Sequence, residues 1–296
     1  MKILITGSSG LIGSALSKAL INDGHEVGAL LRTRRDDQPY WDIEKGVIEL
    51  GSFSAPDVVI HLAGENLTDS RWSQAKKDRI VNSRINSTQL LVDYFVHADD
   101  KPQLLISGSA IGFYGNRADE IVDESSVPGT GFSARLCQQW EAATEPAKQA
   151  GIRVVNIRTG IVLSPAGGAL KKMLLPFQLG LGGVLGNGRQ YVSWISIDDM
   201  VDAIKYVMTQ ASISGAVNMV SPEPATNYQL TKALGRALHR PTLFPMPAFV
   251  ARILFGEMAD ELLLSSTRVK PAKLLAAGYP FHHTDLSGAL EYLLNK

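Results

Sequence analysis

The chain has 296 residues, of which 45% are hydrophobic and 20% are charged, which is the composition of a globular protein with a large buried core. Its 29 basic and 29 acidic side chains give a net charge of zero, so no partner of the nucleic-acid or membrane-surface class is predicted. The same balance leaves little charge repulsion between copies and permits a homodimer.

The first residues and the single cysteine predict a cytoplasmic protein. The chain enters a glycine loop at Gly7, without the basic start, apolar stretch and cleavage site of a signal peptide. Its apolar runs are far shorter than the roughly 18 residues of a membrane helix. Cys137 is the only cysteine, which excludes an intramolecular disulfide. The six histidines are scattered and lack ligand spacing, so no metal site is expected.

The first 160 residues alternate short β-branched runs with amphipathic helical patterns. This alternation predicts a parallel sheet covered by helices on both faces. The expected strands are Lys2–Thr6, Glu26–Leu31, Val58–His61, Gln103–Ser107 and Arg153–Ile157, and the expected helices are Leu11–Asn22, Ala75–His97 and Ser133–Gln149.

The pattern changes after Gly160. Residues 164–190 are rich in glycine, and prolines punctuate the later segments. Helical patterns recur at 198–209, 227–239 and 285–294, and Ala216–Val220 resembles a strand. We interpret this part as a smaller region on the substrate side.

Three glycines follow the first strand at a spacing of three. Gly7 would make the tight turn, Gly10 would let a pyrophosphate approach the backbone, and Gly13 would bring the helix close to the strand. The helix that begins here offers free N–H groups and a positive dipole end to phosphates. The expected cofactor contacts in this loop are Gly7, Ser9, Gly10, Leu11, Ile12 and Gly13.

The end of the second strand indicates which dinucleotide is bound. An NAD enzyme would carry Asp or Glu there, to bind the ribose 2′-hydroxyl. This chain has Arg32, 19 positions after Gly13. A guanidinium suits the 2′-phosphate of NADP, because it donates charge-assisted bidentate hydrogen bonds. The cofactor expected is therefore NADP(H).

Strands, helices and glycine loop together predict an α/β Rossmann fold, a doubly wound parallel sheet with a smaller C-terminal substrate domain. The expected division is a Rossmann NADP-binding core over residues 1–162 and a substrate-side region over 163–296. A part near 198–220 is expected to return to the core.

Several segments together give the chain a family resemblance. Besides the glycine loop, they are Ala63-Gly64-Glu65-Asn66, Trp140-Glu141, Trp194–Asp199 and Arg268-Val269-Lys270-Pro271. With these the chain resembles an atypical, epimerase-like subgroup of the extended short-chain dehydrogenases/reductases that carries a C-terminal extension. The resemblance implies further cofactor contacts: Leu62, Ala63 and Gly64 on the adenosine and ribose side, Arg158, Gly160 and Val162 beside the nicotinamide, and also Arg84 and Ser107.

The same resemblance implies a catalytic serine, but the residues that usually accompany it are missing from this chain. The parent family combines Ser or Thr with a Tyr-x-x-x-Lys pair and a helper Asn. Ser109 matches the serine, although a structural capping role is the alternative. Ser133 and Cys137 stand where the tyrosine and lysine should be, and Arg84 stands at the asparagine position.

Three other side chains are weaker candidates. Tyr114 could donate a proton, or it could be a packed loop aromatic, because no lysine lowers its pKa. Tyr191 and Trp194 follow the glycine-rich segment and could cover a substrate, or they could fill a seam between domains. Cys137 on a helix face is expected to be an inert thiol.

Two functions stay open at this point. One is an NADP-dependent oxidoreductase or sugar-nucleotide epimerase acting on an unknown small molecule. The other is an NADPH-binding regulatory or sensor protein without turnover. The missing Tyr-Lys pair favours the second, whereas the retained serine favours the first.

Overall fold

The computed structural model describes residues 1–35 and 37–295. The chain divides into two compact units, each assembled from three segments. The first unit consists of Met1–Ser109, Leu136–Ile157 and Lys205–Ala216, and the second of Ala110–Arg135, Arg158–Ile204 and Val217–Lys296. The predicted functional division at residue 162 stays a prediction.

A six-stranded sheet, in the order β12-β8-β6-β5-β1-β2, forms the centre of the first unit. Its pairs β1–β2, β1–β5 and β5–β6 are parallel, and the strand order reverses between β1 and β5. This Rossmann-like topology confirms the predicted α/β fold class. The strands are β1 (Lys2–Thr6), β2 (Glu26–Leu30), β5 (Val58–His61), β6 (Leu104–Ala110), β8 (Arg153–Thr159) and β12 (Gly215–Met219).

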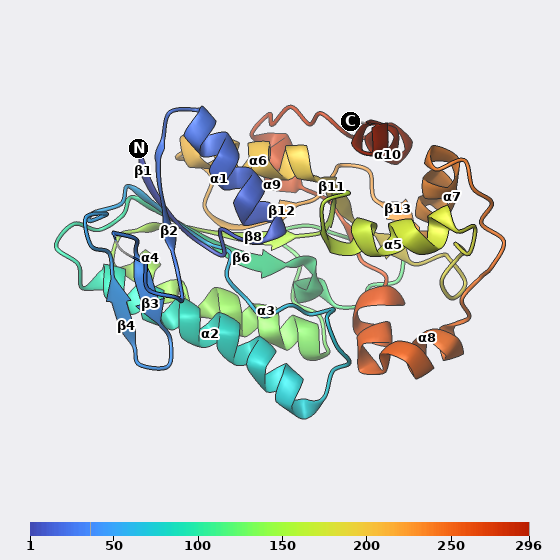
Figure 1. Cartoon of the computed structure of the whole chain (residues 1–296), viewed down its shortest axis with the longest axis horizontal. Helices are drawn as coiled ribbons and strands as arrows, with labels where there is room; N and C mark the ends of the chain where they lie inside the picture. Colours follow the sequence, from blue (N-terminus) through green and yellow to red (C-terminus); the bar gives the residue numbers. More distant parts are fainter. Residues whose placement is uncertain (36, 296) are drawn as a thin grey trace. The chain divides into compact units, whose positions relative to one another are not determined.

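Helices cover both faces of this sheet (Figure 1). Helix α1 (Leu11–Asn22) lies on one face, and α2 (Gln74–Val96) lies on the other beside α4 (Glu145–Gln149). The single helix expected over Ser133–Gln149 is instead two, α3 (Phe132–Ala142) and α4. Pro146 in the first turn of α4 explains the break, because proline has no N–H for the helix that precedes it.

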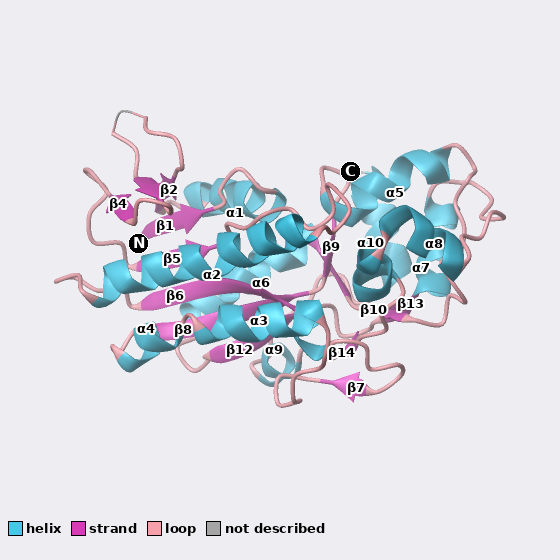
Figure 2. Cartoon of the chain, turned by 90° about the horizontal axis from the view of Figure 1, so that it is seen from below, coloured by secondary structure: helices cyan, strands magenta, loops and turns pink. Residues whose placement is uncertain are grey.

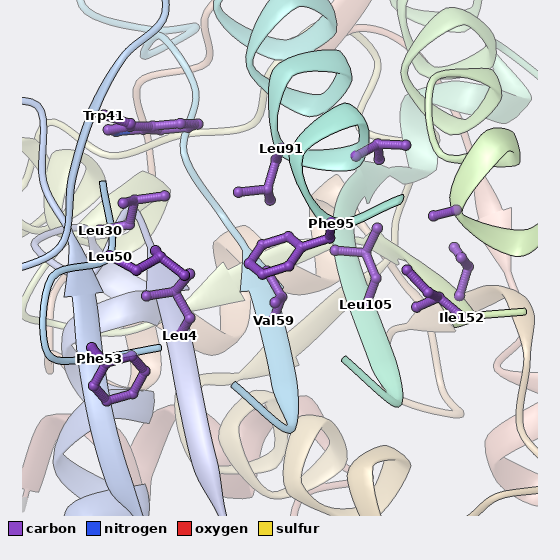
Figure 3. Packing of buried hydrophobic residues seen from close by; sticks show 13 residues of the cluster. Leu4, Leu30, Trp41, Leu50, Phe53, Val59, Leu91, Phe95, Leu105 and Ile152 are labelled. Atoms are coloured by element: carbon purple, nitrogen blue, oxygen red, sulfur yellow. The ribbon is translucent and has the colours of Figure 1, made fainter. Parts of the chain in front are cut away.

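The core between the sheet and α2 is aliphatic and aromatic (Figure 3). Leu91 and Phe95 of α2 reach Val59 and Leu105 of the sheet. Trp41 joins them from a short hairpin, β3 (Tyr40–Asp42) and β4 (Val47–Glu49), which the sequence pattern did not predict. The buried members of this cluster are Leu4, Leu30, Trp41, Leu50, Phe53, Val59, Leu91, Val92, Phe95, Leu105, Ala147, Ile152 and Val154.

The second unit is built from short strand pairs and helices (Figure 2). The strand pairs are β9 (Ile161–Leu163) with β11 (Trp194–Ser196), β10 (Tyr191–Val192) with β13 (Ala225–Thr226), and β7 (Ile121–Val122) with β14 (Arg268–Val269). Its helices are α5 (Gly168–Gln178), the first part of α6 (Ile197–Thr209), α7 (Asn227–Ala237), α8 (Ala248–Phe255), α9 (Ala272–Ala276) and α10 (Leu286–Asn295), with a 3₁₀ turn at Ile111–Tyr114 and a π-helical turn at Ala259–Leu263. Helices α5, α7 and α10 enclose a second apolar cluster, which includes Trp194.

A chain of buried hydrogen bonds ties the ends of β1 and β5 to α2. The Thr6 hydroxyl oxygen accepts the backbone N–H groups of Leu62 and Ala63, at 3.1 Å each, so its own proton goes to His61 Nδ1 at 2.7 Å. Because Nδ1 accepts, the ring proton lies on Nε2, which faces the Ser87 hydroxyl at 3.1 Å. The arrangement therefore requires a neutral imidazole.

The environment of His61 keeps the ring neutral. Burial lowers the pKa of His61 to about 3, and the nearby charge of Arg84 acts in the same direction. A proton added to Nδ1 would also remove the acceptor on which the Thr6 hydroxyl depends.

The difference in the pKa of His61 between the folded and the unfolded chain predicts a loss of stability in mild acid. The unfolded chain binds a proton at His61 below its usual pKa of about 6.5, whereas the folded chain does so only near pH 3. Stability is therefore lost as the pH falls through this window, by about 2 kcal/mol between pH 7 and pH 5. Urea unfolding at both pH values should show this decrease for the natural chain and a smaller one for His61→Gln. Equal decreases in the two proteins, or an NMR titration of folded His61 near pH 6.5, would contradict the assignment.

Candidate functional site

The glycine loop between β1 and α1 has the conformation that its spacing predicts. Gly7 has φ of +69°, and a Cβ there would lie 2.7 Å from the backbone of Leu62. A Cβ on Gly13 would lie 2.2 Å from the Gly7 carbonyl oxygen, so α1 can begin this close to β1 only with glycine at both positions.

Gly10 is less crowded than the other two glycines. It precedes the first residue of α1, and the nearest atom to a Cβ there is the Gly7 carbonyl oxygen at 3.2 Å. Among the described residues, no side chain caps α1 and no acidic residue lies in its first turn. The helix therefore keeps its N–H groups and its positive end for an anion.

The segment Leu62–Gly64 follows β5 beside the glycine loop. The Thr6 hydroxyl holds its first two N–H groups, as described above. Gly64 lies against the guanidinium of Arg84, because a Cβ there would be 3.1 Å from Arg84 Cζ. The two segments that the sequence assigned to the cofactor, at residues 7–13 and 62–64, thus adjoin at the end of the sheet where the strand order reverses.

Arg84 is a buried cation on α2. Its Nη1 donates to the Ile80 carbonyl at 3.2 Å, its Nη2 donates to the Glu65 carbonyl at 3.0 Å, and its guanidinium lies over the Trp140 ring at 5.1 Å. Burial lowers the pKa of Arg84 to about 10, while proximity to Cys137 opposes that shift. The side chain therefore stays charged at neutral pH.

Arg32 and Arg34 differ in what they contact. Arg34 is paired with Glu49 and stacks on the Tyr40 ring at 4.6 Å. Arg32 lies exposed just after β2, and no ion pair holds it among the residues that the structure describes. Of these two arginines, Arg32 is therefore the one that can turn to a ligand phosphate.

The two serines of β6 lie in different surroundings. Ser107 is completely buried, and its hydroxyl makes one long contact of 3.4 Å with the Gly108 carbonyl. Ser109 is 5% exposed and donates to Glu141 Oε1 at 2.7 Å. Sequence reasoning did not place Glu141 in the site. The two residues are 32 positions apart, and no local pattern in the sequence links them.

The positions of the missing Tyr-Lys pair hold two buried side chains. Cys137 is buried, as expected for an inert thiol. Ser133 is also buried, and its backbone N–H donates to Glu261 Oε2 at 3.0 Å.

Tyr114 belongs to a buried polar group in the second unit. Its hydroxyl donates to Asn218 Oδ1 at 2.7 Å and accepts from Arg158 Nη1 at 2.9 Å. The Arg158 guanidinium also stacks on Phe113, 3.4 Å from the ring centre. Burial raises the pKa of Tyr114 to about 12. This phenol is a poor acid, which argues against the catalytic role considered for it.

The remaining candidates in the second unit, except Tyr191, pack against other parts of the protein. Gly160 lies so close to Ser193 that a Cβ would be 2.6 Å from its carbonyl oxygen. Val162 pairs with Ile195 between β9 and β11. Trp194 is 0% exposed within the apolar cluster, and its indole donates to the Glu223 carbonyl, which argues against a role as a substrate lid.

Tyr191 remains partly exposed, with the Arg268 guanidinium 4.7 Å from its ring centre. Among the substrate-side candidates it therefore keeps a surface that a ligand could reach. Its assignment stays a prediction.

A Ser-His-Asp cluster elsewhere in the second unit is not a catalytic triad. Ser196 Oγ lies 3.0 Å from His283 Nδ1, and Asp199 Oδ2 lies 3.4 Å from the same nitrogen. In a triad, the serine and the aspartate meet opposite nitrogens of the ring. Here the serine caps α6 by accepting the Asp199 N–H at 3.0 Å.

A metal site and a membrane-spanning helix are both absent from the described part of the chain. No group of three or more His, Cys, Asp or Glu side chains suits a metal ion within residues 1–35 and 37–295. Among the helices of that same part of the chain, none has the length and apolar character to cross a membrane.

Comparison with protein families matches two segments. Residues 3–219 match the NAD dependent epimerase/dehydratase family, and residues 246–293 match a domain of unknown function, DUF1731. An epimerase family protein of Mycobacterium bovis is 46% identical over 292 residues, covering 98% of this chain and 96% of that protein. Human epimerase family protein SDR39U1 is 33% identical, covering 99% and 100%.

Solved structures give the same result. Human SDR39U1 (isoform 2), crystallised with NADPH, superposes with a TM-score of 0.93 at 32% identity and covers all of both chains. UDP-glucuronic acid 4-epimerase from Bacillus cereus shares the fold, with a TM-score of 0.78 at 21% identity over 100% of this chain and 98% of that one. The family match and the full-length relatives together show that this chain belongs to the NAD-dependent epimerase/dehydratase family.

Proposed function

We propose that the chain binds NADP(H) on its first unit and acts as an oxidoreductase or epimerase on a small molecule whose identity is open. The observation that carries this proposal is the uncapped start of α1 behind Gly10. Gly10 leaves room for a pyrophosphate, and the free N–H groups of α1 can donate to it. The NADPH in the human relative supports the same choice of cofactor.

Arg32 supports NADPH over NADH. Its guanidinium is exposed after β2 and is not engaged by an ion pair among the described residues, whereas Arg34 is paired with Glu49. A free guanidinium can bind the 2′-phosphate through charge-assisted hydrogen bonds. The contacts predicted for Arg158, Gly160 and Val162 remain proposals.

For catalysis, a dinucleotide held by the glycine loop and Arg32 would supply the hydride chemistry. The Ser109 hydroxyl would orient a substrate oxygen by turning its proton from Glu141 to that oxygen. The Glu141 carboxylate would then be the group beside Ser109 that can take up or return a proton. A serine–carboxylate pair transfers a proton less readily than a tuned phenol, because the serine hydroxyl ionises much less easily. Turnover should therefore be slow.

The second candidate is an NADPH-binding regulatory protein without turnover. The observation in its favour is that Ser109 is only 5% exposed and already bonded to Glu141, while the Tyr-Lys positions hold Ser133 and Cys137. Hydride transfer from NADPH to a panel of aldehydes, ketones and sugar nucleotides separates the two functions. Substrate-dependent loss of NADPH supports the enzyme, and NADPH binding without any such loss supports the regulator.

The first test concerns the choice of cofactor. Calorimetric titration should show NADPH binding at least about tenfold tighter than NADH, because one charge-assisted contact contributes about 1.5–3 kcal/mol. Arg32→Ala should remove most of this preference, and Arg35→Ala is the matched control that should keep it. Equal affinities of the natural chain for the two cofactors would exclude the assignment of Arg32.

The second test concerns the glycine loop. Gly10→Val should fold, because a Cβ there would approach only the Gly7 carbonyl oxygen, at 3.2 Å, but it should lose NADPH binding through a clash with the pyrophosphate. Gly13→Ala should instead destabilise the protein by about 1–3 kcal/mol or more, because its Cβ would overlap the Gly7 carbonyl oxygen. Thermal unfolding and NADPH titration of both variants are the measurements. Normal NADPH binding by folded Gly10→Val would show that the phosphates lie elsewhere.

The third test concerns catalysis. With any substrate found in the panel, Ser109→Ala should lower kcat by about a hundredfold, the usual effect of losing one donor to a developing oxyanion. Cys137→Ala should keep both NADPH binding and activity. A dead cysteine variant beside an active serine variant would mean a thiol-based site.

A further inference from the structure

Lys76, near the start of α2, is a buried cation that the proposed function does not use. Its side chain is 2% exposed, and a lysine is almost never buried to this extent unless it is paired. Its Nζ donates to Glu65 Oε1 at 2.8 Å and to Asp69 Oδ1 at 2.6 Å. Burial opposes the charge of Lys76, but the bonds to Asp69 and Glu65 raise its pKa. The lysine therefore stays charged.

The two carboxylates belong to the loop that leads from β5 to α2. Glu65 comes directly after Leu62–Gly64, the segment that the sequence assigned to the cofactor, and Asp69 lies four positions further along. The bonds to Lys76 lower the pKa of both carboxyl groups, so both stay ionised at neutral pH. One buried ammonium group thus fastens two points of this loop to the start of α2.

Glu65 is fastened to α2 through its backbone as well. Its N–H donates to Ser83 Oγ at 2.9 Å, and its carbonyl oxygen accepts from Arg84 Nη2 at 3.0 Å. Arg79 Nε adds a contact of 3.3 Å to the same carboxylate oxygen that Lys76 holds. The bond from Lys76 is the shortest of these four, and it comes from the most deeply buried of the four donors and acceptors on α2. Helix α2 therefore sets the position of Glu65.

The cofactor segment Leu62–Gly64 is consequently held at both ends. The Thr6 hydroxyl accepts its first two N–H groups, and Lys76 holds Glu65 immediately after it. A ligand that binds to a backbone already in place loses less conformational entropy than one that must first order it. We propose that Lys76 is a positioning residue for the cofactor, given the proposed binding of NADP(H) at the glycine loop. Through Glu65 it fixes the backbone of Leu62–Gly64 and so raises the affinity for NADP(H).

A purely structural role of Lys76 makes a different prediction. If the ion pair served only to stabilise the fold, its loss would lower the melting temperature and leave the cofactor affinity of the folded protein unchanged. If Lys76 positions the cofactor segment, the affinity falls even in a protein that is completely folded. The affinity of folded variants therefore separates the two roles.

NADPH titration, at a temperature at which circular dichroism shows every variant to be folded, tests the proposal. Lys76→Met removes the ammonium group from an unbranched side chain, and Glu65→Ala removes its carboxylate partner. Each should weaken NADPH binding about fivefold or more, the lower end of the usual coupling between two sites. The double variant should bind about as weakly as either single one, because both substitutions remove the same bond. Asp69→Asn should have a smaller effect, because Asp69 lies further from Leu62–Gly64 along the chain.

Phe95→Leu is the matched control for stability. Phe95 is 3% exposed near the other end of α2, where it packs in the core between that helix and the sheet (Figure 3). The substitution should lower the melting temperature, because it disturbs a packed core, but it should keep the natural affinity for NADPH.

Hydrogen exchange of the chain without NADPH gives a second measurement. The N–H groups of Ala63 and Glu65 are bonded to Thr6 and Ser83, so Lys76→Met should speed their exchange more than Phe95→Leu does. Unchanged exchange at these two amides would overturn the proposal.

A folded Lys76→Met variant with the natural affinity for NADPH would also overturn it, and so would an equal loss of affinity in Phe95→Leu. A natural chain that does not bind NADPH would overturn the proposed function together with this role of Lys76. The failure of the positioning role alone is therefore distinct from the failure of the proposed function.

Discussion

The hydroxyl of Thr6 is the point on which the first unit depends. It accepts two N–H groups from the segment after β5 and donates to His61, so it joins the ends of β1 and β5 within one hydrogen-bond network. Gly7 follows immediately and lies against the same segment at a distance that excludes a Cβ. Two neighbouring residues thus set how closely the loops after β1 and β5 approach. The network is buried, and a buried network is stable only when each member has its partner.

That constraint also determines which charges the site can hold. The imidazole of His61 must stay neutral for Thr6 to donate to it, and Arg84 nearby helps to keep it so. A cation of this region is therefore the guanidinium of Arg84 on α2, and its two shorter hydrogen bonds go to the backbone carbonyl groups of Ile80 and Glu65. Beside the glycine loop the histidine is neutral and the start of α1 is uncapped. The first turn of α1 holds no carboxylate that would oppose the positive potential there. An anionic cofactor would find that potential available.

Local signals predicted most of the first unit, and contacts between distant residues account for what was missed. The glycine spacing and the helical periodicity gave α1 its observed bounds, Leu11–Asn22, because both depend on near neighbours. The bond from Ser109 to Glu141 joins residues 32 positions apart, and no periodicity reports it. Trp194 looked like a ligand contact because it follows a glycine-rich segment, but its burial arises from packing by α5, α7 and α10. The candidate site was predictable where it is made of backbone and unpredictable where it is made of paired side chains.

The departures from the usual catalytic set have one physical consequence. Binding a dinucleotide needs close backbone approach and positive charge, and the glycine loop and Arg32 offer both. Fast proton transfer needs a group whose pKa lies near the working pH. Burial moves the pKa of Tyr114 up to about 12 and leaves Arg84 at about 10, so neither group can exchange a proton readily at neutral pH. Glu141 is the ionisable group in contact with Ser109, and its carboxylate is bonded to that hydroxyl. The chain therefore keeps the features that a cofactor needs, whereas the proposed proton step would depend on the pair of Ser109 and Glu141. The rate of that step would decide between the proposed slow enzyme and the proposed sensor.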